Sequence, residues 1–580
     1  MLKECVDIFY KKYKNSGEEK LITATYKLDE GDYFIVKENG SYEYIKIEKN
    51  SNSDSVEKYD YLAQRDYLSR LLDMNKPIDD KKQIHSNNYL TFFIKNPTLQ
   101  EKKDLLDEII KKYYETLKNP LLKYNKGEKQ KAYINLENVL GKPDEKSIEK
   151  NFSWIQKNLY TLNEVQKNSK NYIKIFFDED IEKYKIENKR YVIPNIYNNV
   201  EYNRLIEEKT YGLPNNNMNL NAKKIYLENK TRKKGFTAPF LLNEDEVFKQ
   251  KLFFDYLQNL VNSGERNIYI TEEEIYSFKD GKFPNSFVNG YYLRLRKEKT
   301  ESAIERFEVI PKYEQELFPN IVLSDSLEGG KNQKLDCGTS IVTKEKFAAL
   351  LNEFLFEGKL FRIIFENIKD IKFTNSKIKN ISNLYKDVFY ELTVKGEIEK
   401  FMRYYKKIFL ELIKYFMSTE EYLTKAYDLY NFMTSIDGGM IVGKHIEIKN
   451  RFRKIFEMKE GEFVNDDEYF FAIGQLFKFL LSRRKDTKRT QEHMARIIDS
   501  KNIEALKTQL LHLYKKYGYD IGEYNIGFNV LYEMVLDYTP VSNKIDQERV
   551  LGGYLSLNLI YEKIKKDNEN KDNQEDKDEK

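Results

Sequence analysis

The hydrophobic pattern of this 580-residue chain changes its period near residue 345, and this change limits the possible folds more than any other feature. Before that point, short runs that alternate apolar and polar residues are mixed with helical segments, and such alternation is typical of half-buried strands. After it, apolar residues recur three and four positions apart, most clearly in 401–417, 467–482, 502–516 and 547–564. The sequence therefore predicts an α+β fold: a mixed N-terminal region with antiparallel strands, followed by an all-α helical bundle.

The length of the chain requires more than one hydrophobic core, because single cores rarely exceed about 250–300 residues. Changes in pattern divide the chain into an α+β region at 1–345, a helical connecting region at 346–457, a helical bundle at 458–566 and a disordered tail at 567–580. The tail is expected to be disordered because DNENKDNQEDKDEK contains no apolar residue that could join a core.

Strand signals are concentrated in residues 21–47, where the alternating runs are LITATYKL, YFIVK and YEYIKI. Asn39-Gly40 separates the last two runs, and an Asn-Gly pair is a strong hairpin signal because both residues tolerate positive φ. We therefore expect an antiparallel meander close to the N-terminus.

The stretch 60–96 follows this meander and combines a helix, a polar loop and a strand. The helix is expected to extend to Leu72 and to be stopped by Pro77, and the strand is expected at 89–94. The polar side chains between them are Asn75, Lys76, Lys81, Lys82, Ser86, Asn87 and Asn88. A polar loop between two apolar anchors suits ligand binding, and it is equally the form of an ordinary connection between a helix and a strand.

Cysteine content and hydropathy indicate the compartment. Cys5 and Cys337 are the only cysteines, which excludes a disulfide framework and a four-cysteine zinc module and fits a reducing compartment. No run approaches 18 consecutive apolar residues, so we expect no membrane span and a cytoplasmic protein.

Recognisable catalytic motifs are missing from the sequence. The Gly-Lys pairs are not followed by Ser or Thr in a Walker A frame, and the four histidines form no HExxH motif. We therefore expect no cofactor, no metal and no enzymatic activity. A carboxylate-dependent nuclease or another nucleic-acid-processing enzyme stays open as an alternative, because Asp and Glu are abundant. A helical scaffold that binds only proteins is the second alternative.

Local basic clusters are the positive signal, since the net charge of the whole chain is only +4. Lysine and arginine at high density neutralise phosphates, whereas an ordinary solvated surface is the alternative interpretation. The candidate nucleic-acid-binding residues outside the loop are Lys230, Arg232, Lys233 and Lys234; Arg294 and Arg296 on one strand face; and Arg483, Arg484, Lys485, Lys488, Arg489 and Arg496.

Three segments also resemble a known family. Residues 66–96, DYLSRLLDMNKPIDDKKQIHSNNYLTFFIKN, resemble the N-terminal signature region of the large subunit of type I-B CRISPR Cascade, the Csh-type family. The segment GLPNNNMNLNAKKIYLENKTRKK is similar to the family's central region, and the helical part ending in QERVLGGYLSLNLIYEK is in keeping with its terminal bundle. Some relatives carry a zinc-binding cysteine cluster, which two distant cysteines cannot form.

The resemblance implies a non-catalytic subunit of an antiviral ribonucleoprotein complex. Its partners would be CRISPR RNA (crRNA), double-stranded target DNA, the backbone, handle-binding and small subunits, and a recruited helicase-nuclease. The protein would bind near the 5′ handle of the RNA and read the motif that flanks the DNA target (the PAM), with the loop lysines and asparagines as candidate contacts. Base pairing would supply most of the sequence specificity.

The resemblance has one more implication, for the C-terminal third. In type I-B systems the small subunit can arise by internal translation of the large-subunit gene. Met458 is the candidate internal start and Met440 the alternative, and both also suit ordinary core or loop positions.

Overall fold

A computed structural model describes residues 2–101, 103–163, 171–197, 203–207, 209–214, 241–297, 302–327, 334–417, 423–438, 440–483, 494 and 497–562. The chain divides into two compact units: Met1–Asp280 with Val288–Pro311, and Gly281–Phe287 with Lys312–Lys580. The fold is α+β, as predicted, with all four sheets before residue 345 and helices after it.

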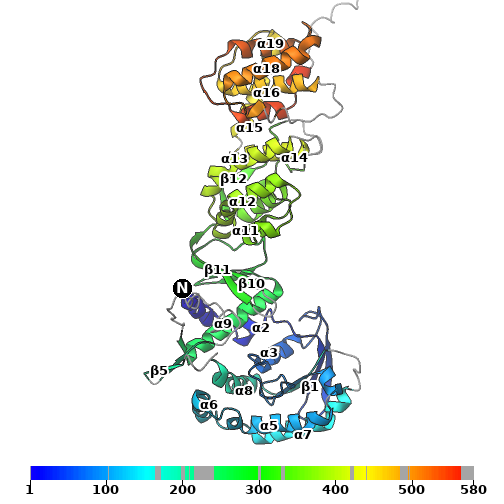
Figure 1. Ribbon diagram of the computed structural model, residues 1–580, viewed down its shortest axis with the longest axis vertical. Coiled ribbons are helices and arrows are strands. Elements are labelled where there is room, and N and C mark those ends of the chain that lie inside the picture. The colour runs from blue at the N-terminus through cyan, green and yellow to red at the C-terminus, as the bar shows by residue number, and fades with distance from the viewer. Residues whose placement is uncertain are drawn as a thin grey trace, which may run out of the picture. The chain divides into compact units, whose positions relative to one another are not determined.

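The first unit contains most of the strands (Figure 1). Its helices are α1 (Leu2–Asn15), α2 (Glu19–Thr23), α3 (Tyr59–Ser69), α4 (Asn96–Glu101), α5 (Lys103–Lys118), α6 (Gly127–Leu140), α7 (Glu145–Asn163), α8 (Ile181–Val192) and α9 (Glu244–Ser263), with 3₁₀ turns at Pro120–Leu122 and Ile193–Asn195. Its strands are β1 (Gly31–Val36), β2 (Tyr42–Ile47), β3 (Thr91–Lys95), β4 (Tyr172–Phe177), β5 (Arg204–Ile206), β6 (Lys209–Gly212), β7 (Leu242–Asn243), β8 (Asn267–Thr271) and β9 (Ile275–Phe278), and it shares β10 (Phe287–Lys297) and β11 (Ser302–Tyr313) with the second unit.

The main sheet of the first unit has the strand order β2-β1-β4-β3. β1 and β2 form the expected hairpin, and Gly40 in its turn has a φ of 83°. The first run of the expected meander, residues 21–28, is not a strand: α2 occupies its first part, and Ile22 is buried in the core. Packing of this short helix against α3 and α9 overrides the alternating pattern. The second neighbour of β1 is instead β4, in parallel.

The main sheet is buried on both faces. Phe34 and Val36 of β1 pack on the side of α5 and α7, whereas Tyr33 and Ile35 pack on the side of α3 (Figure 1). Because side chains alternate along a strand, Lys174 of β4 falls on the same face as Phe176, which is the face that α3 covers. A lysine thus lies where the pattern requires an apolar residue.

A second charge lies opposite Lys174, on α3. Tyr59, Leu62 and Ala63 contact the sheet, and Asp66 follows them at helical spacing on the same stripe. The interior of the first unit therefore contains a carboxylate and an ammonium group between a helix and a sheet.

Helix α9 forms another wall of this region, and both of its ends are well specified. Asn243 and Glu246 form a capping box at its start, and Gly264 ends it in the left-handed conformation with a φ of 92°. Strand β8 follows at once and pairs with β9 and β10 in the sheet of order β11-β10-β8-β9.

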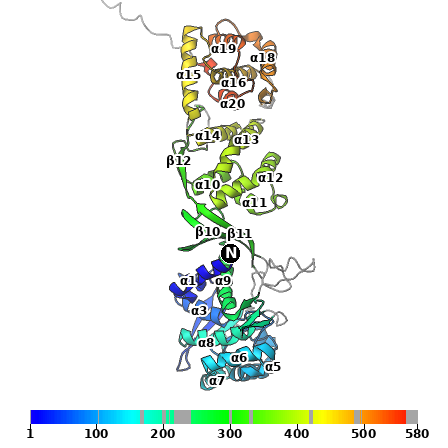
Figure 2. The same cartoon turned by 90° about the vertical axis from the view of Figure 1, so that its left-hand side faces the viewer.

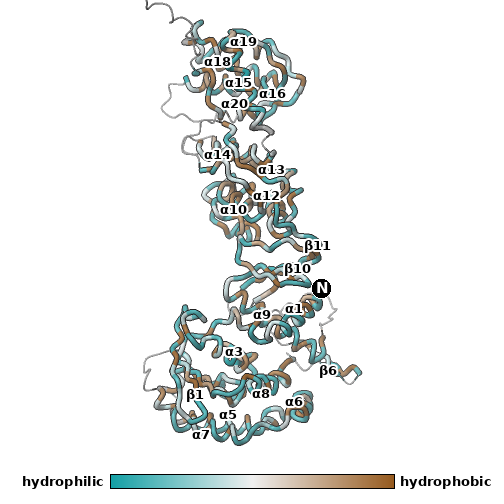
Figure 3. Tube along the Cα trace, turned by 180° about the vertical axis from the view of Figure 1, so that it is seen from behind, coloured by the Kyte–Doolittle hydropathy of each residue, from teal (hydrophilic) through white to brown (hydrophobic). Residues whose placement is uncertain are grey.

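The second unit is mainly helical. It contains the strand pair β12 (Glu316–Val322) and β13 (Ser340–Thr343), followed by α10 (Lys344–Phe354), α11 (Leu360–Phe365), α12 (Ser376–Tyr390), the π-helix η7 (Glu391–Lys395), α13 (Glu399–Phe416), α14 (Leu423–Ile436), α15 (Met440–Met458), α16 (Asp466–Ser482), α18 (Ile503–Tyr517), α19 (Ile526–Asp537) and α20 (Gln547–Leu555), with 3₁₀ turns at Ile368–Asp370, Gly518–Asp520 and Leu559–Tyr561. Figure 3 shows apolar and hydrophilic segments alternating along these helices, as expected for amphipathic helices that surround a core.

The boundary between the units lies earlier in the sequence than the expected boundary at residue 345. The physical reason is that β12 contacts α14 and β13 contacts α10, so both strands belong with the helices that follow them. The expected limits at 458 and 566 stay predictions, and the expected disordered tail lies outside the described residues.

Helix α16 is the centre of the C-terminal helices and crosses α20 at glycines. A Cβ atom at Gly474 of α16 would collide with the carbonyl oxygen of Val550, and one at Gly553 of α20 would collide with that of Phe471. Helix α15 lies beside the same group (Figure 2), and its Phe452 ring is 6.1 Å from that of Phe471. Met440 begins α15 and Met458 ends it.

Candidate functional site

The stretch 60–96 folds into a helix, a loop and a strand, but the helix is shorter than predicted. Helix α3 ends at Ser69 rather than near Leu72, because Arg70 takes an extended conformation and forms a β-bridge with Ser86. The chain therefore turns before Pro77 is reached. β3 runs from Thr91 to Lys95.

Ser86, Asn87 and Asn88 do not lie on a surface, which corrects their predicted role as nucleic-acid contacts. All three are buried. Asn87 donates hydrogen bonds from Nδ2 to the carbonyl oxygens of Leu68 (3.1 Å) and Arg70 (2.8 Å), and Asn88 Nδ2 donates to Ser69 Oγ (3.1 Å). Their amides satisfy the polar groups at the end of α3 and thereby hold the loop in place.

Lys76 also has a structural role. Its Nζ atom donates to the carbonyl oxygens of Asn195 (2.7 Å) and Tyr197 (2.6 Å). Burial, together with the nearby charge of Lys129, lowers the pKa of Lys76 to about 7. A half-neutral lysine that already donates to two carbonyl groups is a poor phosphate ligand.

The remaining candidates in the loop lie at the surface. Asn75, Lys81 and Lys82 are exposed, and Lys82 Nζ donates to Asn75 Oδ1 at 3.3 Å. These three residues are the part of the predicted loop site that solvent can reach.

The two arginines of β10 differ in their surroundings. Arg294 is buried and forms an ion pair with Asp280 (2.5 Å), whereas Arg296 is exposed and lies 4.0 Å from Glu305. The predicted basic face is therefore wrong for Arg294, because Asp280 already neutralises it in the interior.

The two other basic clusters fall mainly outside the described residues. That applies to Lys230, Arg232, Lys233 and Lys234 and to Arg484, Lys485, Lys488, Arg489 and Arg496. Arg483 is described: it follows the last residue of α16, and its guanidinium carbon lies 4.6 Å from the ring centroid of Phe479.

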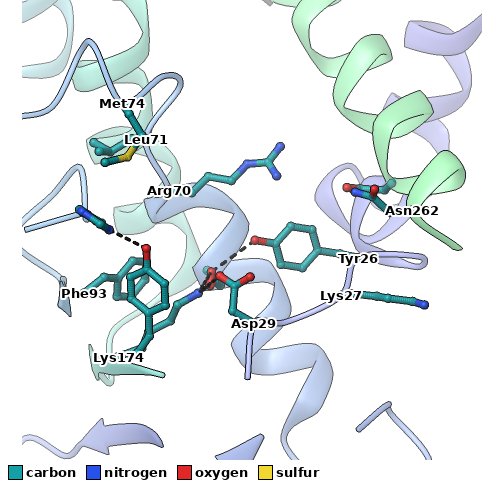
Figure 4. A pocket seen from close by; sticks show the side chains of 13 residues that line it. Tyr26, Lys27, Asp29, Arg70, Leu71, Met74, Phe93, Lys174 and Asn262 are labelled. Carbon is teal, nitrogen blue, oxygen red and sulfur yellow. Dashed lines mark hydrogen bonds and ion pairs between the residues drawn. The ribbon is translucent and has the colours of Figure 1, made fainter. Parts of the chain in front are cut away.

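A polar pocket of about 290 Å³ opens beside the stretch 60–96, in the first unit. That stretch contributes Asp66, Arg70, Leu71, Met74, His85 and Phe93 to the lining. The other walls are formed by Tyr26, Lys27 and Asp29 before β1, by Tyr172 and Lys174 of β4, and by Asn259 and Asn262 of α9. Figure 4 shows the Arg70 side chain extending from the end of α3 toward Asn262.

The floor of the pocket is an ion cluster centred on Lys174 (Figure 4). Lys174 Nζ lies 2.7 Å from an oxygen of Asp66 and 2.9 Å from an oxygen of Asp29. The side chains of Lys174 and Asp66 are only 4% and 2% exposed, whereas that of Asp29 is 65% exposed. Burial alone would lower the pKa of Lys174, but the charges of Asp66 and Asp29 outweigh burial and hold it well above its ordinary value.

A second carboxylate, Asp255 of α9, holds Arg70 in position. Asp255 lies 3.1 Å from Arg70 Nη2 and 2.6 Å from Lys251 Nζ, and it accepts a hydrogen bond from the Tyr67 hydroxyl at 2.9 Å. Burial opposes ionisation of Asp255, but Lys251 and Arg70 outweigh that effect and keep its pKa below the ordinary value. The guanidinium of Arg70 is thus anchored at one edge and remains about one third exposed.

His85 and Tyr172 form a neutral pair in the wall of the pocket. Nδ1 of His85 lies 2.7 Å from the Tyr172 hydroxyl, and Nε2 lies 3.2 Å from the carbonyl oxygen of Lys82. Burial lowers the pKa of His85 and raises that of Tyr172, so both are uncharged at neutral pH. Cations, aromatic rings and amides together are the groups with which proteins bind phosphates and bases.

Asp29, Asp66 and Lys174 were not among the residues predicted from sequence, although two of them carry a sequence signal. Lys174 interrupts the apolar run YIKIFF, and Asp66 interrupts an apolar helical stripe. Charges at positions where the pattern requires apolar residues indicate either a buried ion pair or a site. Their partnership could not be read from the sequence, because 108 residues separate them.

Within the described ranges, no group of three or more His, Cys, Asp and Glu residues is placed to hold a metal ion. None of the helices in the same ranges is long and apolar enough to cross a membrane. Comparison of the chain with models of protein families, with curated proteins and with solved structures gives no match.

Proposed function

We propose that this chain is the non-catalytic large subunit of a type I-B CRISPR RNA-guided surveillance complex. One observation carries the proposal: the segment that resembles the signature region of that family, residues 66–96, contributes six residues to the polar pocket. A pocket with cationic, aromatic and amide groups suits recognition of unpaired RNA.

In this proposal the first unit binds the 5′ handle of the crRNA and the duplex that flanks the DNA target. The pocket and the exposed residues Asn75, Lys81, Lys82 and Arg296 are its candidate contacts. The second unit stabilises the opened target and supports recruitment of the helicase-nuclease. The basic residues that follow α16 are the candidates for contacts with DNA phosphates.

The C-terminal helices are proposed to be made separately as well, as the small subunit. Met440 is a better start than Met458, because α15 begins at the former and ends at the latter. A product starting at Met458 would lack Phe452 and Phe456, whose rings pack against Phe471 and Gly527. Mass spectrometry of the expressed gene tests this, and the absence of a truncated product would contradict it.

Purification with the products of neighbouring genes, followed by sequencing of the bound RNA, tests the main proposal. We expect RNAs derived from a CRISPR repeat. A preparation free of RNA, or metal-dependent cleavage of nucleic acid by the chain alone, would overturn the proposal. The second outcome would favour a carboxylate-dependent nuclease, and the first a protein-binding scaffold.

Variants of the exposed lysines test whether the loop contacts nucleic acid. Changing Lys81 and Lys82 together to Ala removes two exposed cations and should weaken binding of all targets. The slope of log K against log salt should fall by about 0.9 for each phosphate contact that is lost. Lys49→Ala is the control, because Lys49 is also exposed but lies outside the loop.

A further inference from the structure

The pocket of the first unit has the dimensions of a site for one small ligand. Its volume of about 290 Å³ lies at the lower end of the range for ligand pockets, which starts near 300 Å³. A single nucleotide is of this size, whereas a dinucleotide is too large to be enclosed. The pocket therefore encloses one nucleotide rather than several consecutive nucleotides.

The charges of the lining favour an anion. Lys174 and Asp66 neutralise each other at the floor, and Asp29 shares the same ammonium group. The cations Lys27 and Arg70 complete the lining, which contains three cations and two carboxylates. Lys27 is exposed, and no ion pair is found for it within the described part of the chain. An anionic group near Lys27 and Arg70 would receive charge-assisted hydrogen bonds.

The buried ion pair argues for a site rather than for stability alone. Taking two charges out of water costs several kcal/mol per ion, and well-packed apolar residues often replace such pairs without loss of stability. Asp66 and Lys174 lie where the helix and strand patterns call for apolar side chains. A charged floor is useful where polar parts of a ligand must be held in a fixed orientation.

The opposite walls of the pocket differ in chemistry (Figure 4). Leu71 and Met74 form an apolar side, against which the flat face of a base can pack. Asp29 has a largely exposed carboxylate and can accept a hydrogen bond from a ribose hydroxyl, as acidic residues do in dinucleotide sites. Asn262 is exposed and can contact the edge of a base.

We infer that this pocket binds one ribonucleotide, with its phosphate at Lys27 and Arg70, a ribose hydroxyl at Asp29, and its base against Leu71 and Met74. The inference rests on the proposed function and deepens it by naming the ligand of the pocket. The same chemistry is offered by a free nucleoside monophosphate and by one unpaired nucleotide of an RNA strand.

Calorimetric titration of the full chain with AMP, GMP, CMP and UMP is the first test. We expect binding of at least one of them, and about tenfold weaker binding by Lys27→Glu, because one charge-assisted contact is lost. Arg70→Gln should have a similar effect. Lys49→Glu makes the same charge change at an exposed site away from the pocket and should bind like the wild type.

The ribose contact is tested with the corresponding deoxyribonucleotides. The wild type should bind the ribonucleotide about tenfold more tightly than its deoxy analogue. Asp29→Asn should reduce this preference without unfolding the protein, because Asp29 is mostly exposed. Equal binding of both sugars by the wild type would overturn the assignment of Asp29.

Short 5′-phosphorylated RNAs distinguish the two sources of the nucleotide. Tighter binding of the RNA than of the mononucleotide, with the same loss in Lys27→Glu, identifies an unpaired nucleotide of a strand; the reverse order identifies a free nucleotide. Unchanged binding by both Lys27→Glu and Arg70→Gln, or no binding of any nucleotide or RNA, would overturn the inference. Fluorescence of Trp154 during thermal unfolding shows whether each variant is folded, since this residue lies in the first unit.

The outcomes also separate this inference from the proposed function. The purified complex could contain repeat-derived RNA while the pocket variants bind RNA and nucleotides normally. That result would remove the pocket assignment alone. Nucleotide binding that depends on Lys27, in a preparation without repeat-derived RNA, would remove the CRISPR function and leave the pocket assignment intact.

Discussion

Each of the two units contains a lysine whose surroundings shift its pKa, and the two pKa values shift in opposite directions. Lys174 of the first unit lies between two carboxylates, which hold its pKa well above the ordinary value. Lys478 of the second unit donates to the carbonyl oxygens of Leu555 (3.3 Å) and Ser556 (2.5 Å), and burial lowers its pKa to about 8.

This difference distinguishes a lysine that stabilises the fold from a lysine that belongs to a candidate site. Among the described residues, Lys478 donates to backbone carbonyls only, at the end of α20, where a helix leaves carbonyl groups unsatisfied. Lys174 has carboxylate side chains as partners and lines a pocket. Lys76 of the first unit belongs with Lys478, since it too donates to two backbone carbonyls and has a lowered pKa.

The largest effect on stability is expected from Lys174→Met. The variant leaves Asp66 buried without its partner, which should lower the free energy of unfolding by about 3–5 kcal/mol. Urea unfolding followed by the fluorescence of Trp154, the only tryptophan, measures this in the first unit. The double variant Asp66→Leu, Lys174→Met removes both charges and should recover most of the loss. If Lys174→Met were as stable as the wild type, that result would contradict a charged pair between Asp66 and Lys174.

A smaller effect is expected from Gly474→Ala in the second unit. The new Cβ atom would collide with the backbone of α20, and overpacking of this kind costs about 1–3 kcal/mol. Gly443→Ala in α15 is the control: its Cβ atom meets no atom within 4 Å, and it should stabilise the helix by up to about 1 kcal/mol. Circular dichroism at increasing urea concentration measures both. Equal stabilities of the two variants would show that the glycine crossing is not close packed.

Lys478→Met should cost about 1–2 kcal/mol, because it removes two hydrogen bonds to carbonyl groups but leaves no buried charge. The expected loss of stability is smaller than for Lys174→Met, and this order tests the comparison between the two lysines. The unfolding transition reported by Trp154 fluorescence should be unchanged, because Trp154 lies in the first unit and Lys478 in the second. A loss as large as that of Lys174→Met would place Lys478 in the same class.

The smallest effect is on the pH dependence of stability, and its sign differs between the lysines. The pKa of Lys478 is lowered, so between about pH 8 and 10.5 the unfolded chain binds a proton that the folded chain does not. Wild type should therefore gain stability relative to Lys478→Met as the pH rises through that window. The pKa of Lys174 is raised, so its contribution is complete below pH 10.5 and is lost at higher pH. Urea unfolding of wild type and Lys478→Met at several pH values tests the expected gain of stability with pH. The same measurements on the Asp66→Leu, Lys174→Met double variant test the expected loss above pH 10.5.

Local signals in the sequence predicted much of the fold. The β1–β2 hairpin follows from Asn39-Gly40, and α13, α16 and α18 follow from their apolar spacing. Residues 21–28 were mispredicted, because contacts with α9 and α3 decide between helix and strand there. The parallel partner of β1 could not be predicted, because no local pattern identifies a strand so far along the chain.

Less of the candidate site could be predicted. The stretch 60–96 was predicted to suit ligand binding and contributes six residues to the pocket lining, yet none of them is one of the predicted site residues. Ser86, Asn87 and Asn88 face inward because the end of α3 needs hydrogen-bond partners. A loop sequence shows which groups are polar, whereas only the tertiary packing decides which of them meet solvent.

The parallel pairing of β1 with β4 also sets an order of events during synthesis. The hairpin β1–β2 and helix α3 leave the ribosome well before Tyr172–Phe177, which must insert beside β1 to complete the sheet. Until then one edge of β1 is open and Asp66 has no lysine partner. A long-range parallel pairing of this kind is slow to form and exposes an aggregation-prone intermediate. The nascent first unit is therefore expected to depend on chaperones until residue 177 has been added.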